Sequence, residues 1–251
     1  MKQAMIFAAG LGTRLKPLTD TMPKALVPVV GRPLLEHVVL RLKANGFERI
    51  VVNVHHFGEQ IIDFLEANNH FGLDIRISDE RAELLETGGG IKKARSLFDP
   101  NSPVLIHNVD ILSNARLDDL YAVPSAQAAL LVSPRQTTRY LQFNDASRLI
   151  GWENIKTGEL RGQKGAQALA FSGIHLFHPS LFPLMDSWPD RFSIIDFYLS
   201  VCADHVIMGV PQTDLRLMDV GKLDTLAEAE TFLTTLSSDT VSAGSPAGII
   251  Q

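Results

Sequence analysis

Residues 8–24 read Ala-Ala-Gly-Leu-Gly-Thr-Arg-Leu-Lys-Pro-Leu-Thr-Asp-Thr-Met-Pro-Lys and follow a short apolar run, residues 4–8, that predicts a β-strand. Glycines at a strand exit let backbone N–H groups approach a phosphate or a flat base. Two cations follow, Arg14 and Lys24, in a loop that two prolines stiffen. A glycine turn with fixed cations at the end of a strand predicts a site for a nucleoside polyphosphate.

Two other glycine-loop sites do not fit these residues. A dinucleotide fingerprint needs a third glycine where Leu15 stands, and an acidic residue after the next strand, where His55 and His56 stand. A Walker A loop needs Gly-Lys-Ser/Thr, but Thr13 and Arg14 follow the second glycine. An ordinary tight turn would explain the glycines, but neither the paired cations nor the prolines.

The stretch resembles the signature of the sugar-1-phosphate nucleotidylyltransferases, Gly-x-Gly-Thr-Arg-Leu-x-Pro-Leu-Thr followed by Pro-Lys. Residues 25–36 are similar to the next segment of that family, and a thinner resemblance extends to residue 233. The resemblance implies an enzyme that converts NTP and a sugar 1-phosphate into NDP-sugar and pyrophosphate, with Mg²⁺ as cofactor, in nucleotide-sugar biosynthesis. A non-catalytic regulatory protein that binds a nucleotide sugar is the alternative from another class.

Within the family, the chain looks most like the short uridylyltransferases that act on N-acetylmuramate 1-phosphate, which would place it in cell-wall metabolism. The compact chain and its Leu-Glu-Thr-Gly-Gly-Gly loop, residues 85–90, support that choice. Mannose- or heptose-1-phosphate guanylyltransferases are the second candidate. The base, the sugar and the oligomeric state stay open.

Length and composition predict an ordinary globular protein with one domain. The chain has 251 residues, of which 45% are hydrophobic and 20% charged. A net charge of −5 argues against general binding to nucleic acid or to an anionic membrane. The single cysteine allows no internal disulfide. Neither a signal peptide nor an apolar run of membrane-spanning length is visible, so we expect a cytoplasmic protein.

Strand and helix patterns alternate from the first strand to residue 110. Apolar runs predict strands at residues 50–54, 75–78 and 104–106, and apolar periodicity predicts helices around residues 35–42, 61–65 and 89–97. Thr87 is the expected cap of the third helix. This alternation predicts a parallel sheet with helices on both faces. The resemblance implies the three-layer α/β/α Rossmann-like nucleotide-diphospho-sugar transferase fold, with a mixed, mainly parallel sheet.

The alternation becomes less regular after residue 110. Several short strands are expected over residues 140–178, as a sheet extension that covers one side of the cleft. A helix at residues 194–202, strands at 206–210 and 215–218, and a last helix at 223–233 complete the predicted domain, residues 1–233. Residues 234–251 are rich in Ser, Thr, Gly and Ala and are expected to form a flexible tail.

Asp110 is the first candidate metal ligand, because it directly follows a predicted strand and α/β sheets bind ligands outside the carboxyl ends of strands. A turn aspartate is the alternative. By resemblance, Asp110 binds Mg²⁺ and Asp219, in Met-Asp-Val-Gly, supplies the second carboxylate. The chain departs from the family at Val109, where glycine is usual, and at Lys222, where threonine is usual.

The resemblance also assigns catalytic roles to Arg14, Lys24 and Asp110. It implies two nucleotide-binding loops, one with Ala8, Ala9, Gly10, Gly12, Thr13, Arg14 and Lys24, and one with Glu86, Thr87 and Gly88. Asn108 and Gly173 would line the sugar pocket, although a strand bulge equally explains Gly173. His55 and His56 lack further ligands at metal spacing, and Asp196 is expected on a solvated helix face.

Overall fold

The computed structural model describes residues 1–242, with side chains described as far as residue 236. β1 (Lys2–Phe7) lies between β4 (Phe47–Val54) and β6 (Val104–Asn108) and pairs with both in parallel. β5 (Asp74–Asp79) continues the parallel order beyond β4. β1, β4 and β6 are largely apolar on both faces because helices cover both sides of the sheet, whereas the edge strand β5 carries polar residues on one face. The predicted strand–helix alternation is therefore confirmed.

The other half of the sheet is mostly antiparallel. β12 (Gln167–Phe177) runs antiparallel to β6 on one side and to β8 (Ala128–Ser133) on the other. Its first residues pair with β9 (Arg139–Phe143), which leads through β10 (Leu149–Asn154) to β11 (Glu159–Gly162). β13 (Ile207–Pro211) joins β8 in parallel. The resulting ten-stranded sheet has the order β11-β10-β9-β12-β6-β1-β4-β5, with β8 and β13 attached beside β12.

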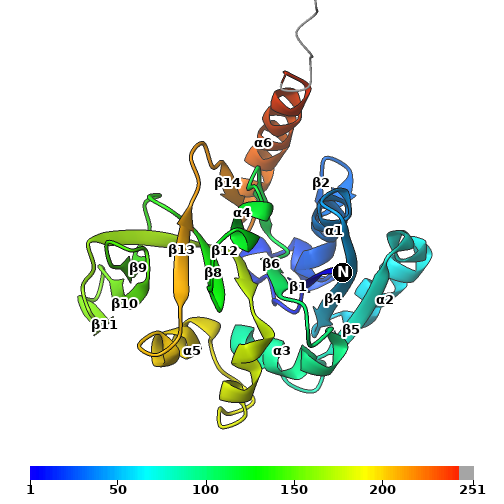
Figure 1. Ribbon diagram of the computed structural model, residues 1–251. Coiled ribbons are helices and arrows are strands. Elements are labelled where there is room, and N and C mark those ends of the chain that lie inside the picture. The colour runs from blue at the N-terminus through cyan, green and yellow to red at the C-terminus, as the bar shows by residue number, and fades with distance from the viewer. Residues whose placement is uncertain (243–251) are drawn as a thin grey trace, which may run out of the picture.

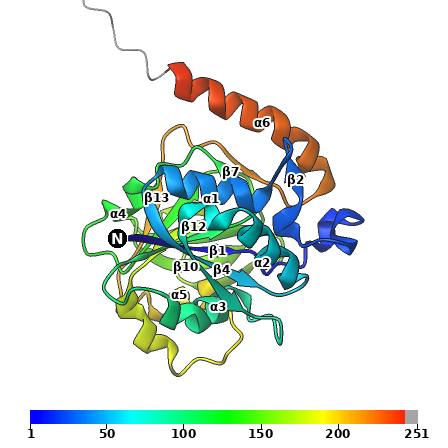
Figure 2. The ribbon, with the colours of Figure 1, turned by 90° about the vertical axis from the view of Figure 1, so that its right-hand side faces the viewer.

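Helices form a layer on each face of the sheet (Figures 1 and 2). One layer contains α1 (Leu34–Ala44), α2 (Gly58–Ala67), α4 (Asp118–Tyr121) and α6 (Leu223–Ser242), and the other contains α3 (Glu86–Ala94) and α5 (Ile194–Val201). Because strand side chains alternate, Ala4 and Ile6 of β1 pack on the first layer and Met5 on the second. The three-layer α/β/α Rossmann-like fold is confirmed.

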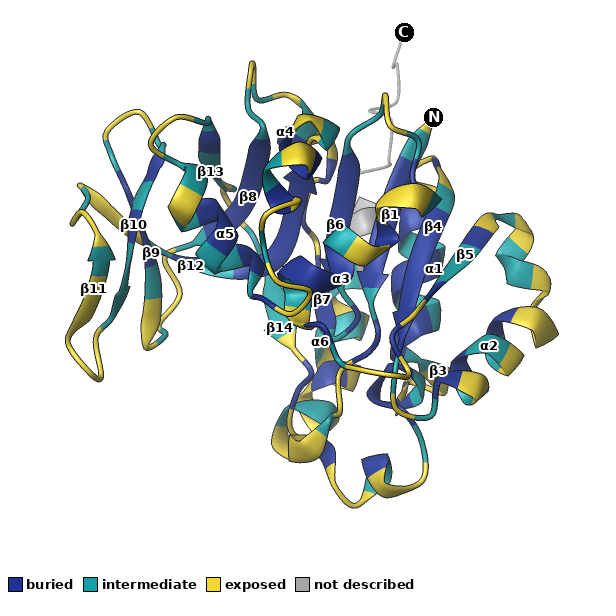
Figure 3. Ribbon diagram, turned by 90° about the horizontal axis from the view of Figure 1, so that it is seen from below, coloured by how far each residue is buried: buried dark blue, intermediate teal, exposed yellow. Residues whose placement is uncertain are grey.

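Burial is deepest in the central strands and falls toward the β9–β11 extension, where exposed residues are frequent (Figure 3). Two small ribbons lie outside the main sheet. β2 (Pro28–Val29) pairs with β3 (Arg32–Pro33), and β7 (Ile111–Ser113) pairs with β14 (Leu217–Asp219). Short 3-10 turns occur at Thr13–Leu15, Leu18–Asp20, Lys24–Leu26, Asn69–Gly72, Arg95–Leu97 and Pro179–Met185.

The sequence predicted that the last helix ends at residue 233, but the helix continues to Ser242. The Thr234 and Thr235 hydroxyls donate to the carbonyl oxygens of Glu230 and Phe232, so these side chains bond to the helix backbone instead of interrupting it. The predicted flexible tail thus falls partly on α6, and residues 243–251 lie outside the described residues. Within the described chain, no helix has both the length and the apolar character needed to cross a membrane.

Candidate active site

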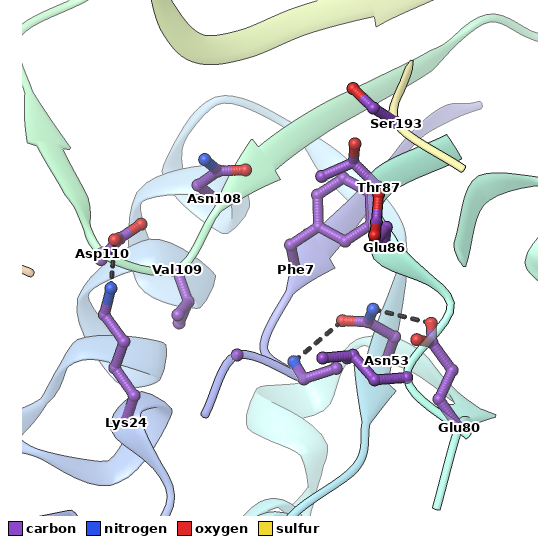
Figure 4. A pocket seen from close by; sticks show the side chains of 13 residues that line it. Phe7, Lys24, Asn53, Glu80, Glu86, Thr87, Asn108, Val109, Asp110 and Ser193 are labelled. Carbon is purple, nitrogen blue, oxygen red and sulfur yellow. Dashed lines mark hydrogen bonds and ion pairs between the residues drawn. The ribbon is translucent and has the colours of Figure 1, made fainter. Parts of the chain in front are cut away.

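The loop after β1 is fixed by a side chain from the neighbouring strand. The Asn53 Oδ1 atom, near the end of β4, accepts hydrogen bonds from the backbone N–H groups of Ala8 and Ala9, at 2.7 and 3.2 Å. The Asn53 amide group donates to the Glu80 Oε1 atom at 2.8 Å (Figure 4). The first two amides of the glycine loop are therefore held by β4 and are not free to bind a phosphate.

Glu80 follows β5 and is completely buried. Its second carboxylate oxygen accepts from the backbone N–H of Leu85, directly before α3, at 3.3 Å. Burial raises the pKa of Glu80, and the donors of Asn53 and Leu85 oppose that shift. The Asn53–Glu80 pair thus connects the glycine loop after β1 with the segment that begins α3.

This connection predicts that Asn53→Ala impairs both folding and nucleotide binding. Two buried N–H groups and a buried carboxylate oxygen lose their partner, so the free energy of unfolding should fall by about 2–4 kcal/mol. The KM for NTP should rise, because the glycine loop is no longer fixed, whereas kcat should change less. Denaturant unfolding and steady-state kinetics measure both effects.

The matched control for that variant is Asn68→Ala, which removes an exposed amide that donates to the carbonyl oxygen of Phe64 at the end of α2. It should change stability and KM little. If Asn53→Ala lowered stability while leaving the KM for NTP at the wild-type value, the pair would be structural only.

A cavity of about 390 Å³ opens beside this network at the carboxyl ends of β1, β4 and β6 (Figure 4). It is the size and position expected for a ligand site in an α/β fold. Seven of the residues predicted from the sequence line it, namely Ala9, Gly10, Lys24, Glu86, Thr87, Asn108 and Asp110. The other predicted site residues are not part of its lining, namely Ala8, Gly12, Thr13, Arg14, Gly88, Gly173 and Asp219.

The remaining lining residues were not among the predicted site residues, although Val109 was noted as a departure from the family pattern. They are Phe7, Asn53, Glu80, Leu84, Val109 and Ser193. A polar residue that ends or follows a buried strand was the available signal for Asn53 and Glu80, and it is the same signal that identified Asp110. Val109, which replaces the usual glycine, lies in the cavity wall and donates its N–H to the carbonyl oxygen of Phe7 at 3.2 Å.

Lys24 and Asp110 form an ion pair at one end of the cavity. Their side chains are only 11% and 14% exposed, so solvent screens the pair weakly. Lys24 begins the 3-10 turn Lys24–Leu26 directly after Pro23, and Asp110 follows β6. The 3-10 turn and the end of β6 thereby place one cation and one carboxylate together.

Asp219 joins this pair through the β7–β14 ribbon. Asp219 lies opposite Ile111, and the next residue, Val220, donates its N–H to the carbonyl oxygen of Asp110 at 2.8 Å. Although Asp219 is partly open to solvent, desolvation at the cleft wall raises its pKa, and the nearby Asp110 charge raises it further. Lys24 and Arg14 act in the opposite direction.

Arg14 approaches Asp219 from the glycine loop. A Cβ atom at Gly221 would lie 2.6 Å from the Arg14 Nη2 atom and 2.6 Å from the Asp219 Oδ1 atom. A larger residue at this point would displace the ends of these two side chains. The fold therefore brings Arg14, Lys24, Asp110 and Asp219 to one place, although they are far apart in the sequence.

Two carboxylates at this place fit a Mg²⁺ ion. In the described part of the chain no group of three or more His, Cys, Asp or Glu side chains has the arrangement of a metal site. Mg²⁺ does not need one, because it is commonly held by one or two carboxylates while water and substrate phosphates complete its octahedron. Desolvation is the main reason that the pKa of Asp219 is raised, and repulsion from Asp110 raises it further; a cation between the two carboxylates would relieve that repulsion.

The glycines of the second loop have a packing role in addition to the predicted one. Gly88 and Gly89 lie inside α3, and their N–H groups donate to the carbonyl oxygen of Phe192, at 2.8 and 3.3 Å. A Cβ atom on Gly89 would overlap the carbonyl oxygen of Asp190. These glycines therefore allow close packing of α3 on residues 190–192.

Thr87 was predicted to cap α3, but the helix already begins at Glu86, so Thr87 is not its cap. Its hydroxyl accepts instead from the backbone N–H of Ile194 at 2.9 Å, which fixes the start of α5. Glu86 pairs with Arg191 at 3.0 Å. Both Glu86 and Thr87 still line the cavity, so their predicted nucleotide contacts remain predictions.

Gly173 lies at an irregularity of β12 and has a φ of +74°. A Cβ atom there would lie 2.7 Å from the Asn108 Nδ2 atom. Gly173 therefore lies in a strand bulge and also next to Asn108, which lines the cavity.

We predict that Gly173→Ala displaces Asn108 and raises the KM for the sugar 1-phosphate severalfold, which corresponds to a loss of about 1 kcal/mol of binding free energy. Steady-state kinetics should show a smaller change in the KM for NTP, and equal changes for both substrates would contradict this role.

Two other residues were described from the sequence. His55 lies near the cleft, where its Nδ1 atom is hydrogen-bonded to the backbone oxygen of Glu80 at 2.6 Å. The Asp196 side chain, expected on a solvated helix face, is 44% exposed and also accepts from Arg161 of β11 at 2.6 Å. This ion pair belongs to a second cavity, described below.

Comparison with known proteins identifies the family. The sequence model of the family described as "Nucleotidyl transferase" matches residues 3–143. N-acetylmuramate alpha-1-phosphate uridylyltransferase of Caulobacter vibrioides is 36% identical over 222 residues, which cover 83% of this chain and 88% of that protein. The protein of the same name from Neisseria meningitidis is 36% identical over 184 residues, or 72% and 77% of the two chains.

Solved structures support the fold. HddC from Yersinia pseudotuberculosis, complexed with GMP-PN, superposes with a TM-score of 0.72 at 22% identity, over 93% of this chain and 100% of that one. A UDP-glucose pyrophosphorylase complexed with UDP-glucose superposes with a TM-score of 0.75 at 16% identity, over 94% of this chain and 99% of that one. The two uridylyltransferase relatives extend over most of the chain, so we conclude that the protein belongs to the nucleotidyl transferase family and is an enzyme of the sugar-1-phosphate nucleotidyltransferase type.

Proposed function

We propose that the protein transfers a uridylyl group from UTP to N-acetylmuramate 1-phosphate or a related hexose 1-phosphate, releasing pyrophosphate. The observation that carries this proposal is the 36% identity to the Caulobacter vibrioides uridylyltransferase over most of both chains. A mannose-1-phosphate guanylyltransferase is the second candidate. It is favoured by 37% identity to the Gibberella zeae enzyme of that activity, but over only 48% of this chain.

In the proposed reaction a phosphate oxygen of the sugar 1-phosphate attacks the α-phosphorus of the NTP. The new P–O bond forms in line with the bond to the β-phosphate, which breaks as pyrophosphate leaves. The attacking oxygen is already anionic, so no side chain has to remove a proton from it. Catalysis then depends on positioning the two anions and neutralising their charge.

Lys24 and Asp110 at the end of the cavity, together with the nearby Arg14 and Asp219, have the charges for this task. Arg14 would hold the NTP phosphates and the departing pyrophosphate with its planar guanidinium. Lys24 would leave its ion pair with Asp110 to contact the reacting phosphates. Asp110 and Asp219 would hold Mg²⁺, which when bound supplies charge neutralisation and polarises the reacting phosphate. The nucleoside would lie toward Glu86, on the Asn53–Glu80 side of the cavity, which leaves the side of Asn108 and Ser193 for the sugar.

The test is a matrix of four NTPs against a panel of sugar 1-phosphates, with pyrophosphate release as the readout. UTP with N-acetylmuramate 1-phosphate should give the highest kcat/KM. A maximum at GTP with mannose 1-phosphate would favour the second candidate. If no pair of NTP and sugar 1-phosphate released pyrophosphate, the proposed activity would be wrong for this protein.

A further inference from the structure

A second cavity, of about 550 Å³, lies next to the first one. It is enclosed by the β9–β11 extension, by Phe171 of β12 and by the start of α5. Ser193, which caps α5, lines both cavities, so the two spaces adjoin each other. In Figure 4, Ser193 lies across the first cavity from the Lys24–Asp110 pair. A sugar whose phosphate is near that pair therefore has room to extend toward the second cavity.

The second cavity is rich in arginine. Its charged lining consists of three arginines, Arg135, Arg139 and Arg161, against two carboxylates, Glu159 and Asp196. The excess of positive charge is notable in a chain whose net charge is −5. The reaction itself does not require it, because the phosphates react at the opposite side of the first cavity.

Both carboxylates are already engaged by one arginine. Arg161 contacts Asp196 at 2.6 Å and Glu159 at 3.7 Å, and its guanidinium lies 4.1 Å from the centre of the Trp152 ring. Arg161 is therefore held against the cavity wall, and the two carboxylates compensate its positive charge. Trp152 and Phe171 supply an apolar surface that suits the carbon atoms of a sugar and its substituents.

The other two arginines have no carboxylate partner. Arg135 donates from Nη2 to the carbonyl oxygen of Phe171 at 2.9 Å, which fixes its guanidinium but leaves its charge uncompensated. Arg139 begins β9, and its guanidinium has no hydrogen bond or ion pair to any side chain or backbone group in residues 1–236. Both residues are exposed, and two guanidinium groups that line one cavity without a counterion are suited to an anion.

Building on the proposed function, we propose that Arg135 and Arg139 bind a carboxylate that the sugar substrate carries in addition to its phosphate. The lactyl ether of N-acetylmuramate 1-phosphate carries such a group, and so does a uronic acid 1-phosphate. The second cavity is then the specificity site that separates acidic sugar 1-phosphates from neutral ones. Arg139 makes the direct contact, and Arg135, held by Phe171, adds a second donor.

The experiment measures kcat/KM with UTP for two matched substrate pairs. N-acetylmuramate 1-phosphate is compared with N-acetylglucosamine 1-phosphate, which lacks only the lactyl ether, and glucuronate 1-phosphate with glucose 1-phosphate. Arg139→Gln should lower kcat/KM for the acidic member of the preferred pair roughly 10- to 100-fold, mainly through KM, as loss of a charge-assisted hydrogen bond predicts. The neutral member should change less than about twofold. Arg139→Lys should restore part of the loss.

The control is Arg116→Gln, which removes an exposed arginine that pairs with Asp119 outside both cavities. It should leave both members of each pair unchanged. Equal losses for acidic and neutral sugars in Arg139→Gln, or no loss for either, would overturn the inference while leaving the proposed function intact. Selective loss for glucuronate 1-phosphate alone would support the carboxylate site and reject N-acetylmuramate as the substrate. A wild-type enzyme that prefers the neutral sugars would overturn the carboxylate site and exclude N-acetylmuramate 1-phosphate as the preferred substrate, whereas uridylyl transfer to another hexose 1-phosphate would stand.

Discussion

Asp219→Asn is expected to lower turnover roughly a thousandfold, because metal-ion stabilisation of a reacting phosphate contributes several kcal/mol. Asp110→Asn should have a similar effect on turnover. The double variant should lose little more than either single variant, since one missing ligand already misplaces the ion. The measurement is pyrophosphate release as a function of Mg²⁺ concentration for wild type, both single variants and the double variant.

Stability distinguishes the two single variants. Asp110→Asn leaves the largely buried Lys24 without its counterion, which costs up to about 3–5 kcal/mol of unfolding free energy. Asp219→Asn should not destabilise the fold, because it removes a charge that desolvation and Asp110 both disfavour. Asp219→Asn is therefore the cleaner test of the metal site.

Asp214→Asn is the matched control for Asp219→Asn. It makes the same change at an exposed position on the same segment, where φ is +60° and asparagine is well tolerated. It should keep wild-type turnover. Normal turnover of Asp219→Asn at low Mg²⁺ would remove Asp219 from the proposed site, and normal turnover of both single variants would remove the metal mechanism.

Arg14→Ala should lower turnover about 10²- to 10³-fold, the effect of losing about 2–4 kcal/mol of charge stabilisation in the transition state. Its melting temperature should change little, because Arg14 is exposed and the fold does not depend on its charge. Arg14→Lys should restore activity only in part, since an ammonium group cannot form the paired hydrogen bonds of a guanidinium.

The control in the same loop is Lys16→Ala, which removes an exposed cation that pairs with Asp20. Surface pairs of this kind contribute little to stability, and Lys16 pairs with Asp20, whereas Arg14 is one of the charges that act on Asp219. Both turnover and melting temperature should stay near the wild-type values. An Arg14→Ala enzyme as active as Lys16→Ala at saturating substrate would contradict the role proposed for Arg14.

The fold was predictable because its signal is local and repeated. Buried parallel strands such as β4 and β6 are short apolar runs, and α1 has apolar residues at helical spacing, so each element is visible on its own. The end of α6 was not predictable in the same way. Its Ser and Thr residues are typical of a tail, and only the hydroxyl–backbone bonds of Thr234 and Thr235 show how a helix accommodates them.

The residues themselves indicate the part of the site that follows the chain, whereas the part assembled by strand pairing was either predicted only from the family resemblance, as for Asp219, or missed. Arg14 and Lys24 lie within one loop, whereas Asp219 meets Asp110 only because β14 pairs with β7. The Asn53–Glu80 pair joins residues 27 positions apart and depends on the parallel order of β4 and β5. The arginines of the second cavity likewise come together through the β9–β11 extension, in which no single residue suggests a binding site.

The most direct test of the central claim quantifies nucleotide sugar and pyrophosphate in the same reaction, with UTP, N-acetylmuramate 1-phosphate and Mg²⁺. Nucleotidylyl transfer predicts that the two products form in equal amounts, and that neither forms when the sugar 1-phosphate or the metal is omitted. Pyrophosphate or phosphate released from UTP without the sugar, or binding of a nucleotide sugar with no product formed under any condition, would contradict it.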